Sequence, residues 1–188
     1  MKREENWVDD IPMKQNKYDD PNFFESYNKM HRSIEGPDAA GEWPDFQSLL
    51  PDFAGKKVLD LGCGFGWHCR YARQNHARSV VGVDISEKML ERARRTTNDR
   101  LISYAQAAIE DIEFDAEQFD VVISSLALHY VQDFELVCRK VHHCLSQEGS
   151  FVFSVEHPIY TALPTQDWCI GPRSVSGRRA KKYTFYGS

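Results

Sequence analysis

The sequence lacks the features of membrane, secreted and repeat proteins. No apolar run approaches the ~20 residues that a membrane-spanning helix needs. The first residues lead into no apolar stretch of the kind that signal peptides carry, and no internal repeat or low-complexity segment is present. These absences predict a cytoplasmic globular protein, and 188 residues suit a single domain.

Cysteine is scarce and poorly spaced for crosslinks or metal sites. The five cysteines make an odd number and include no C-x-x-C pair, which indicates free thiols in a reducing compartment. Cys138 and His142 would share one face of a helix, but a zinc site needs two further ligands in suitable geometry. We therefore expect an ordinary helix here and no metal site.

Clustered positive charge is missing from most of the chain, whose formal net charge is −5. From Gly171 onward there are five basic residues and no acidic ones, so the remainder is strongly acidic. An acidic body argues against nucleic-acid binding, because phosphate contacts need clustered positive charge. We interpret the basic end as a solvated tail, with contact to an anion as the alternative.

Apolar strand patterns alternate with helical patterns through the centre of the sequence. The expected strands are 58–61, 79–83, 101–106, 119–124 and 149–155. The expected helices between them run to about residue 75, from 86 to 96, and from 134 to 145. Such alternation predicts an α/β fold: a doubly wound, Rossmann-like, mostly parallel sheet with helices on both faces.

The chain before the first strand has a different pattern. Aromatic and apolar residues between 23 and 31 recur at spacings of three and four, which predicts one amphipathic helix with an aromatic face. A short helix is expected to end before Pro51. We divide the chain into a helical extension or lid over 1–50, a core over 51–160, and an irregular basic tail over 161–188.

The most informative segment is VLDLGCGFG, at residues 58–66. A buried strand runs into a turn with Gly62, Gly64 and Gly66, and a helical pattern follows at once. Glycines allow positive φ and close backbone approach, and the first turn of a helix offers free amide donors. This arrangement is typical of a site for a nucleotide-bearing cofactor. The spacing G-x-G-x-G differs from the G-x-G-x-x-G of dinucleotide-binding folds.

A carboxylate follows the second expected strand, at Asp84. Ligands of doubly wound sheets bind beyond the carboxyl ends of the strands, near the point where strand order reverses. A carboxylate there can accept hydrogen bonds from both hydroxyls of a ribose. The alternative is that Asp84 merely caps the following helix. Glycine turn and acid together predict a nucleoside site.

These motifs resemble those of class I S-adenosylmethionine-dependent methyltransferases, in the type 11-like bacterial group that acts on small molecules. The resemblance extends from about Tyr18 to Ile159. It implies that the glycine loop wraps the methionine half of the cofactor. The residues implied there are Asp60, Gly62, Cys63, Gly64 and Gly66.

Three further segments carry the resemblance. In the motif that begins at Asp84, the acid binds ribose and Ile85 packs on adenine, and we include Met89 of the next helix among the cofactor contacts. The segment 106–111 resembles the adenine-edge segment, although family members often carry an acid where Ala108 stands, so backbone groups near Ala108 and Ile109 would read the adenine. The segment 119–130 resembles the motif that lines the methyl-transfer end, which implies Ser125 and Leu126.

The implied reaction is methyl transfer to a small-molecule acceptor by in-line displacement. His129, at the expected mouth of the site, is our candidate for a base where the acceptor needs one, with Glu156 and His157 as weaker alternatives. The lid implied by the resemblance would place Tyr27 against the sulfonium, where a π face favours a cation. An aromatic stripe that simply packs on the sheet edge is the competing interpretation.

The resemblance is incomplete after the fifth strand, where class I domains continue with a helix and an antiparallel strand pair. Only 29 residues follow Ile159, which implies a C-terminally shortened member. Its fifth strand would form an exposed edge, and the chain is expected to dimerise or aggregate through it. Two alternatives stay open: a non-catalytic remnant that binds the cofactor or a partner chain, and an NAD-dependent oxidoreductase.

Overall fold

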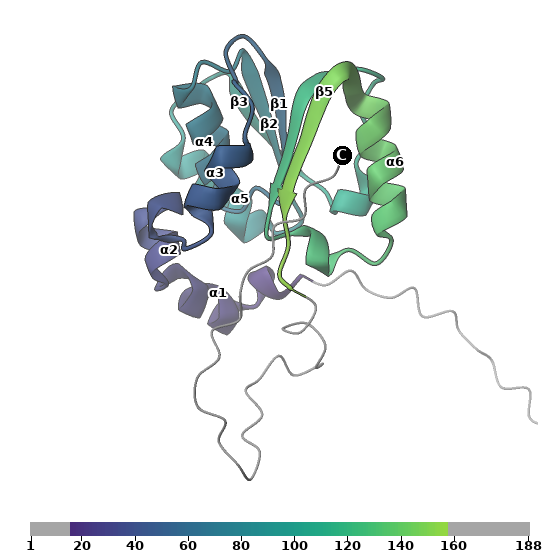
Figure 1. Ribbon diagram of the computed structural model, residues 1–188. Helices are drawn as coiled ribbons and strands as arrows, with labels where there is room; N and C mark the ends of the chain where they lie inside the picture. Colours follow the sequence, from purple (N-terminus) through teal and green to yellow (C-terminus); the bar gives the residue numbers. More distant parts are fainter. Residues whose placement is uncertain (1–15, 158–188) are drawn as a thin grey trace, which may run out of the picture.

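The fold is built on one five-stranded parallel sheet with the order β3-β2-β1-β4-β5 (Figure 1). The computed structural model describes residues 16–157. The strands are β1 Lys57–Leu61, β2 Ser79–Asp84, β3 Ile102–Gln106, β4 Phe119–Ser125 and β5 Leu145–Ser154. Strand order reverses between β1 and β4, so the predicted doubly wound α/β fold is confirmed.

Helices cover both faces of the sheet (Figure 1). One face packs on α3 (Trp43–Leu49), α4 (Trp67–Gln74) and α5 (Glu87–Thr96), and the other on α6 (Phe134–Cys144). Successive β1 residues serve opposite faces: Val58 belongs to the first core cluster and Leu59 to the second, and both are fully buried. This two-sided burial explains why the strands read as continuous apolar runs.

The N-terminal region forms a helical layer near the carboxyl ends of the strands (Figure 1). It contains the 3₁₀ helices η1 (Lys17–Asp19) and η2 (Pro37–Ala39), together with α1 (Pro21–Asn28) and α2 (His31–Glu35). The single helix expected over 23–31 is therefore two helices. Met30 adopts an extended conformation (φ −68°, ψ 143°), which ends one helix and starts the next.

Strand β5 begins earlier than the sequence predicts, directly after α6. Phe119 pairs with Leu145 but Val121 pairs with Ser150, so β5 carries extra residues in a bulge. A Cβ at Gly149 would lie 2.5 Å from Leu145 Cγ. The predicted start at Gly149 was wrong, because pairing with β4 already begins at Leu145 and Gly149 lies within the strand, next to the shift in register.

The described part of β5 has β4 as its neighbour on one side and forms an edge on the other. Phe153 and Val155 are about two-fifths exposed there, and Phe134 of α6 lies 5.8 Å from the Phe153 ring. The expected basic tail and the question of a further strand pair fall outside the described residues. No helix among residues 16–157 is long and apolar enough to cross a bilayer.

Candidate active site

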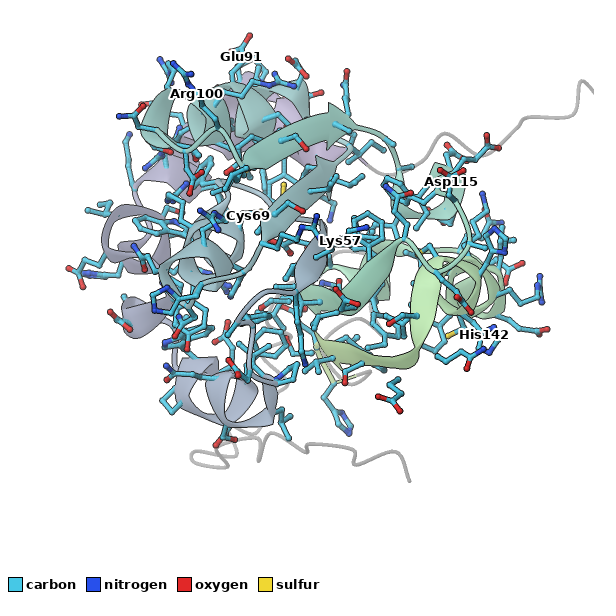
Figure 2. The ribbon with its side chains drawn as sticks, turned by 90° about the horizontal axis from the view of Figure 1, so that it is seen from above. Lys57, Cys69, Glu91, Arg100, Asp115 and His142 are labelled. Atoms are coloured by element: carbon cyan, nitrogen blue, oxygen red, sulfur yellow. The ribbon has the colours of Figure 1, made fainter. Side chains whose placement is uncertain are left out.

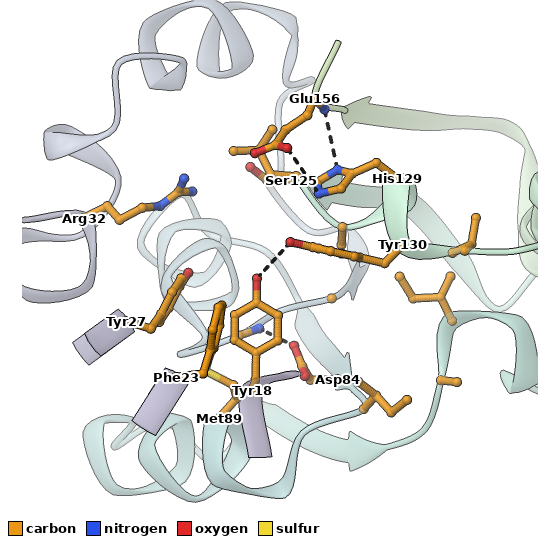
Figure 3. Close-up of a pocket in the computed structure, with 18 of the residues that line it drawn as sticks. Tyr18, Phe23, Tyr27, Arg32, Asp84, Met89, Ser125, His129, Tyr130 and Glu156 are labelled. Carbon is orange, nitrogen blue, oxygen red and sulfur yellow. Dashed lines mark hydrogen bonds and ion pairs between the residues drawn. The ribbon is translucent and has the colours of Figure 1, made fainter. Parts of the chain in front are cut away.

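A cavity of about 330 Å³ opens at the carboxyl ends of the strands, beside the reversal of strand order (Figure 3). Its volume is at the lower end of the roughly 300–1,000 Å³ that small-molecule sites span. The wall combines the glycine loop, the end of β2, the exit of β4 and the N-terminal helical layer. Predicted residues on this wall are Tyr27, Gly62, Gly64, Asp84, Ile85, Met89, Ala108, Ile109, Ser125, Leu126 and His129.

The glycine loop has the left-handed backbone that its sequence predicts. Gly62, Gly64 and Gly66 have φ values of 75°, 51° and 71°. A Cβ at Gly62 would lie 2.3 Å from the Cβ of Ala127, whereas a Cβ at Gly64 would meet no atom within 4 Å. Gly62 therefore permits close packing of two loops, and Gly64 borders open space in the cavity.

Asp84 links the end of β2 to the glycine loop. Its Oδ2 accepts a hydrogen bond from the Gly64 amide (2.8 Å) and its Oδ1 accepts one from the Ser86 amide (2.9 Å). Burial raises the pKa of this carboxyl, and the two amide donors oppose that rise. The cap of α5 is Ser86, whose hydroxyl accepts from the Met89 amide, so Asp84 is not the helix cap.

Leu126 stands out on the cavity wall because it is a non-glycine residue with a positive φ of 53°. Its amide donates to the Ser154 carbonyl at 2.9 Å, which ties the exit of β4 to the end of β5. Such strained residues cluster at functional sites. The strain here is consistent with the predicted position of Leu126 at the reacting end.

Three predicted residues lie outside this cavity: Asp60, Cys63 and Gly66. Asp60 is 1% exposed, and its Oδ2 accepts a hydrogen bond from Cys69 Sγ (3.2 Å). Burial raises the pKa of Asp60 to about 7. Gly66 is the N-cap of α4, and its amide donates to the Cys63 carbonyl at 2.8 Å. Cys63 borders a second, smaller cavity.

The second cavity, of about 70 Å³, adjoins the first across Gly62 and Gly64. Within the described chain, the buried Ser33 Oγ and Trp67 Nε1 have no hydrogen-bond partner. Arg32 lines both cavities, and its Nη2 lies 3.1 Å from Glu42 Oε1. This pocket offers hydrogen-bond donors beside the glycine loop.

His129 faces Glu156 on the wall of the large cavity (Figure 3). The Glu156 amide lies 3.5 Å from His129 Nδ1, and Glu156 Oε2 lies 4.0 Å from His129 Nε2. The imidazole is 6% exposed, and burial lowers its pKa while Glu156 opposes that change. A neutral imidazole that accepts at Nδ1 carries its proton on Nε2, so His129 is a donor toward the carboxylate.

Aromatic rings from the helical layer and from the segment after β4 line the large cavity. The Tyr18 ring centroid lies 5.2 Å from that of Tyr27 and 6.3 Å from that of Tyr130. The Tyr18 and Tyr130 hydroxyl oxygens are 3.5 Å apart (Figure 3). Burial raises the pKa of both Tyr18 and Tyr27, so both phenols are neutral donors.

A family model described as a methyltransferase domain matches residues 59–153, which are half of the chain. The matched segment covers all five strands except for a few residues at the start of β1 and the end of β5. The chain belongs to this methyltransferase family.

Solved structures agree with the methyltransferase assignment. A Listeria monocytogenes protein assigned to the S-adenosylmethionine-dependent methyltransferases is 52% identical with a TM-score of 0.67, over 71% of this chain and 63% of that one. An S-adenosylmethionine-dependent methyltransferase from Mesorhizobium loti is 50% identical with a TM-score of 0.65, over 66% of this chain and 57% of that one. The class I fold implied by the sequence is confirmed, and the oxidoreductase alternative is set aside.

A curated relative, an uncharacterized protein of Haemophilus influenzae, is 39% identical over 150 residues, which are 77% of this chain and 59% of that protein. This methyltransferase chain therefore spans about three-fifths of the length of that relative.

The helix that carries Cys138 and His142 lies away from the methyltransferase site. Figure 2 shows His142 on the outer surface of α6, whereas Cys69 points inward against the sheet. Across residues 16–157, no group of three or more His, Cys, Asp or Glu side chains is arranged to hold a metal ion.

Sequence reasoning missed several residues of the site, among them Tyr18, Arg32, Ser33 and Trp67. Tyr18 was missed because it lies in η1, and a single turn of 3₁₀ helix has no periodic signal. Arg32 and Ser33 reach the glycine loop through the packing of α2, which periodicity does not encode. Trp67 did have a signal, since it opens the helix directly after Gly66.

Proposed function

We propose that the protein binds S-adenosylmethionine across the two cavities and transfers its methyl group to a small acceptor. The observation that carries this proposal is the bond between the Asp84 carboxylate and the Gly64 amide at the reversal of strand order. It brings an acid and a glycine turn together on the wall of a cavity that suits a small molecule.

The nucleoside half would lie along the end of β2. Each Asp84 oxygen accepts one backbone amide and keeps lone pairs for a ribose hydroxyl. Ile85, Met89 and Ile109 supply apolar surface for adenine on the same wall. The backbone near Ala108 is left to read the adenine edge.

The amino-acid half would lie toward the second cavity. A carboxylate needs donors, and Ser33 Oγ and Trp67 Nε1 are buried there without partners among the described residues. The Arg32 guanidinium borders the same space and can form charge-assisted hydrogen bonds. Gly62 and Gly64, which line both cavities, allow the ligand to pass close to the backbone.

The reaction would be a single displacement. Bound S-adenosylmethionine supplies an electrophilic methyl group, so the chain itself contributes alignment and exclusion of water. The aromatic layer over the cavity, with Tyr18, Tyr27 and Tyr130, would exclude water from the reacting end. The role of His129 as a base stays a prediction.

Thermal shift assays with S-adenosylmethionine, S-adenosylhomocysteine and NADH test the proposal. Stabilisation by the first two ligands and not by NADH is expected, because a ligand that binds the folded state raises the melting temperature. Stabilisation by NADH alone would contradict it. Radiolabelled methyl transfer to a panel of small acceptors then separates an active enzyme from a cofactor-binding remnant.

A further inference from the structure

The reacting end of the cavity carries one carboxylate, and its surroundings identify what it can bind. Glu156 lines the cavity directly after β5, and its side chain is 45% exposed. The other carboxylates that line the cavity already accept hydrogen bonds from the protein backbone. Asp84 holds the glycine loop, and Glu110 accepts the Gln132 amide (2.8 Å) beside the proposed adenine site.

His129 faces this carboxylate. The Glu156 backbone amide occupies Nδ1, so the Nε2 proton is directed to the Glu156 side chain 4.0 Å away. His129 Nε2 has no hydrogen-bond partner within 16–157. A single nitrogen or oxygen atom of a ligand would fit against Oε2 at the usual ~2.9 Å.

We propose that the methyl acceptor is an amine and that the Glu156 carboxylate binds its nitrogen, with His129 as the residue that positions the carboxylate. This inference rests on the proposed function. The nitrogen lone pair forms the bond to the methyl carbon, and the electrons of the broken C–S bond go to sulfur. The positive charge therefore moves from sulfur to nitrogen, and any N–H proton of the product is released to solvent.

Glu156 lies where that charge would arrive. A fixed carboxylate beside the nitrogen stabilises the positive charge that develops there. The rings of Tyr18, Tyr27 and Tyr130 line the same cavity, and their π faces favour a cation as well.

A carboxylic acid as acceptor fits this end poorly. Its oxygen would approach the Glu156 carboxylate, and like charges at short distance repel. Arg32 is the cation on this wall, but it pairs with Glu42 and borders the second cavity. The two parts of the proposed site therefore differ in charge. Hydrogen-bond donors lie where the amino-acid half of the cofactor would bind, and an acceptor carboxylate lies where methyl transfer would occur.

The test compares wild type with Glu156→Gln, which keeps the shape of the side chain and removes its charge. The matched control is Glu148→Gln, an exposed glutamate of β5 that lies outside both cavities. Methyl transfer is measured on primary, secondary and tertiary amines and on carboxylic acids of the same size, and S-adenosylhomocysteine affinity is measured by calorimetry.

We expect methylation of amines, with kcat/KM about 10- to 100-fold lower in Glu156→Gln and unchanged in Glu148→Gln, as loss of a charged hydrogen bond predicts. S-adenosylhomocysteine affinity should stay within about twofold in both variants. Two results would overturn the proposal. One is methylation of carboxylic acids alone, and the other is binding of S-adenosylhomocysteine without methylation of any amine. A Glu156→Gln variant with weakened S-adenosylhomocysteine binding would instead assign Glu156 to the cofactor and also overturn it. Wild type that binds no S-adenosylhomocysteine would refute the proposed function itself.

Discussion

Single residues fix the geometry of the site mainly through the backbone they permit. Gly62 combines a φ of 75° with a position where a Cβ would contact Ala127 at 2.3 Å. This role could be predicted from the sequence, because a G-x-G turn after a buried strand needs residues without side chains. The contact with Ala127 could not, since it joins loops 65 residues apart.

Gly62→Ala should lower the free energy of unfolding by about 2 kcal/mol or more, because alanine is strained at a positive φ and its Cβ would overpack against Ala127. Urea denaturation of the unliganded protein measures this. Gly41→Ala is the control, because a Cβ there meets no atom within 4 Å and φ is not positive, so its effect should stay within about 0.5 kcal/mol. Equal stability of the two variants would refute the steric account of the loop.

Asp60 makes the free energy of unfolding depend on pH, and substitution of Asp60 isolates this dependence. Its folded-state pKa is raised to about 7, so the folded state binds a proton more tightly than the unfolded state. The resulting stability is present below about pH 4 and is lost as pH rises through 7.

Asp60→Asn removes this titration while keeping the shape of the side chain. Relative to wild type, the variant should gain roughly 4 kcal/mol of unfolding free energy between pH 4 and pH 8. Paired denaturation curves across that range give the difference. His68, whose pKa burial lowers to about 4, is common to both proteins and cancels. A difference that does not change with pH would contradict the buried, proton-holding state of Asp60.

At the scale of elements, the sheet was predictable, whereas the layer over it was predictable as helical but not in its contacts. The central strands β1, β2 and β4 carry runs of β-branched and apolar residues between turn residues, because both of their faces are buried. The layer over 16–49 depends on contacts between distant segments. Asp19 accepts a hydrogen bond from the Ser86 hydroxyl at 2.6 Å, for example, and no local periodicity encodes such a contact.

Helix α5 holds this layer in place through Arg92. The Arg92 guanidinium donates to Asn28 Oδ1 and to the Ser33 carbonyl (2.8 Å), and its carbon lies 4.0 Å from the Phe65 ring centroid. One side chain thus joins α1 and α2 to the glycine loop.

Arg92→Gln should loosen α1 and α2, because it removes two charged donors and the stacking on Phe65. Hydrogen exchange over residues 17–35 should quicken while α6 stays protected, and the dissociation constant for S-adenosylhomocysteine should rise about 10-fold. Arg94→Gln, which breaks an exposed pair with Glu87 on the same helix, is the control and should change neither. Identical exchange in the two variants would show that Arg92 does not hold the layer.

At the scale of the whole molecule, the described sheet ends in an apolar edge at β5. Phe153 is 39% exposed beside Phe134, which is 43% exposed. Unpaired strand edges with apolar side chains promote pairing with another chain. We propose that copies of the protein associate through this edge.

Phe153→Lys should weaken that association by placing a charge on the edge. Sedimentation velocity over a range of concentrations measures it, with Ile34→Lys as control, because Ile34 is 61% exposed on α2, in the N-terminal layer rather than on β5. A wild-type protein that stays monomeric at high concentration would refute association through β5.

The central claim is that Asp84 and the glycine loop form the cofactor site. Its most direct test is calorimetric titration of S-adenosylhomocysteine into wild type and into Asp84→Asn, with melting temperatures recorded to show that both are folded. We predict binding to wild type and an affinity roughly 100-fold lower or worse in the variant, because the substitution removes the charge and turns one of the two acceptor oxygens toward ribose into a donor. Equal affinity in a folded Asp84→Asn protein would contradict the account.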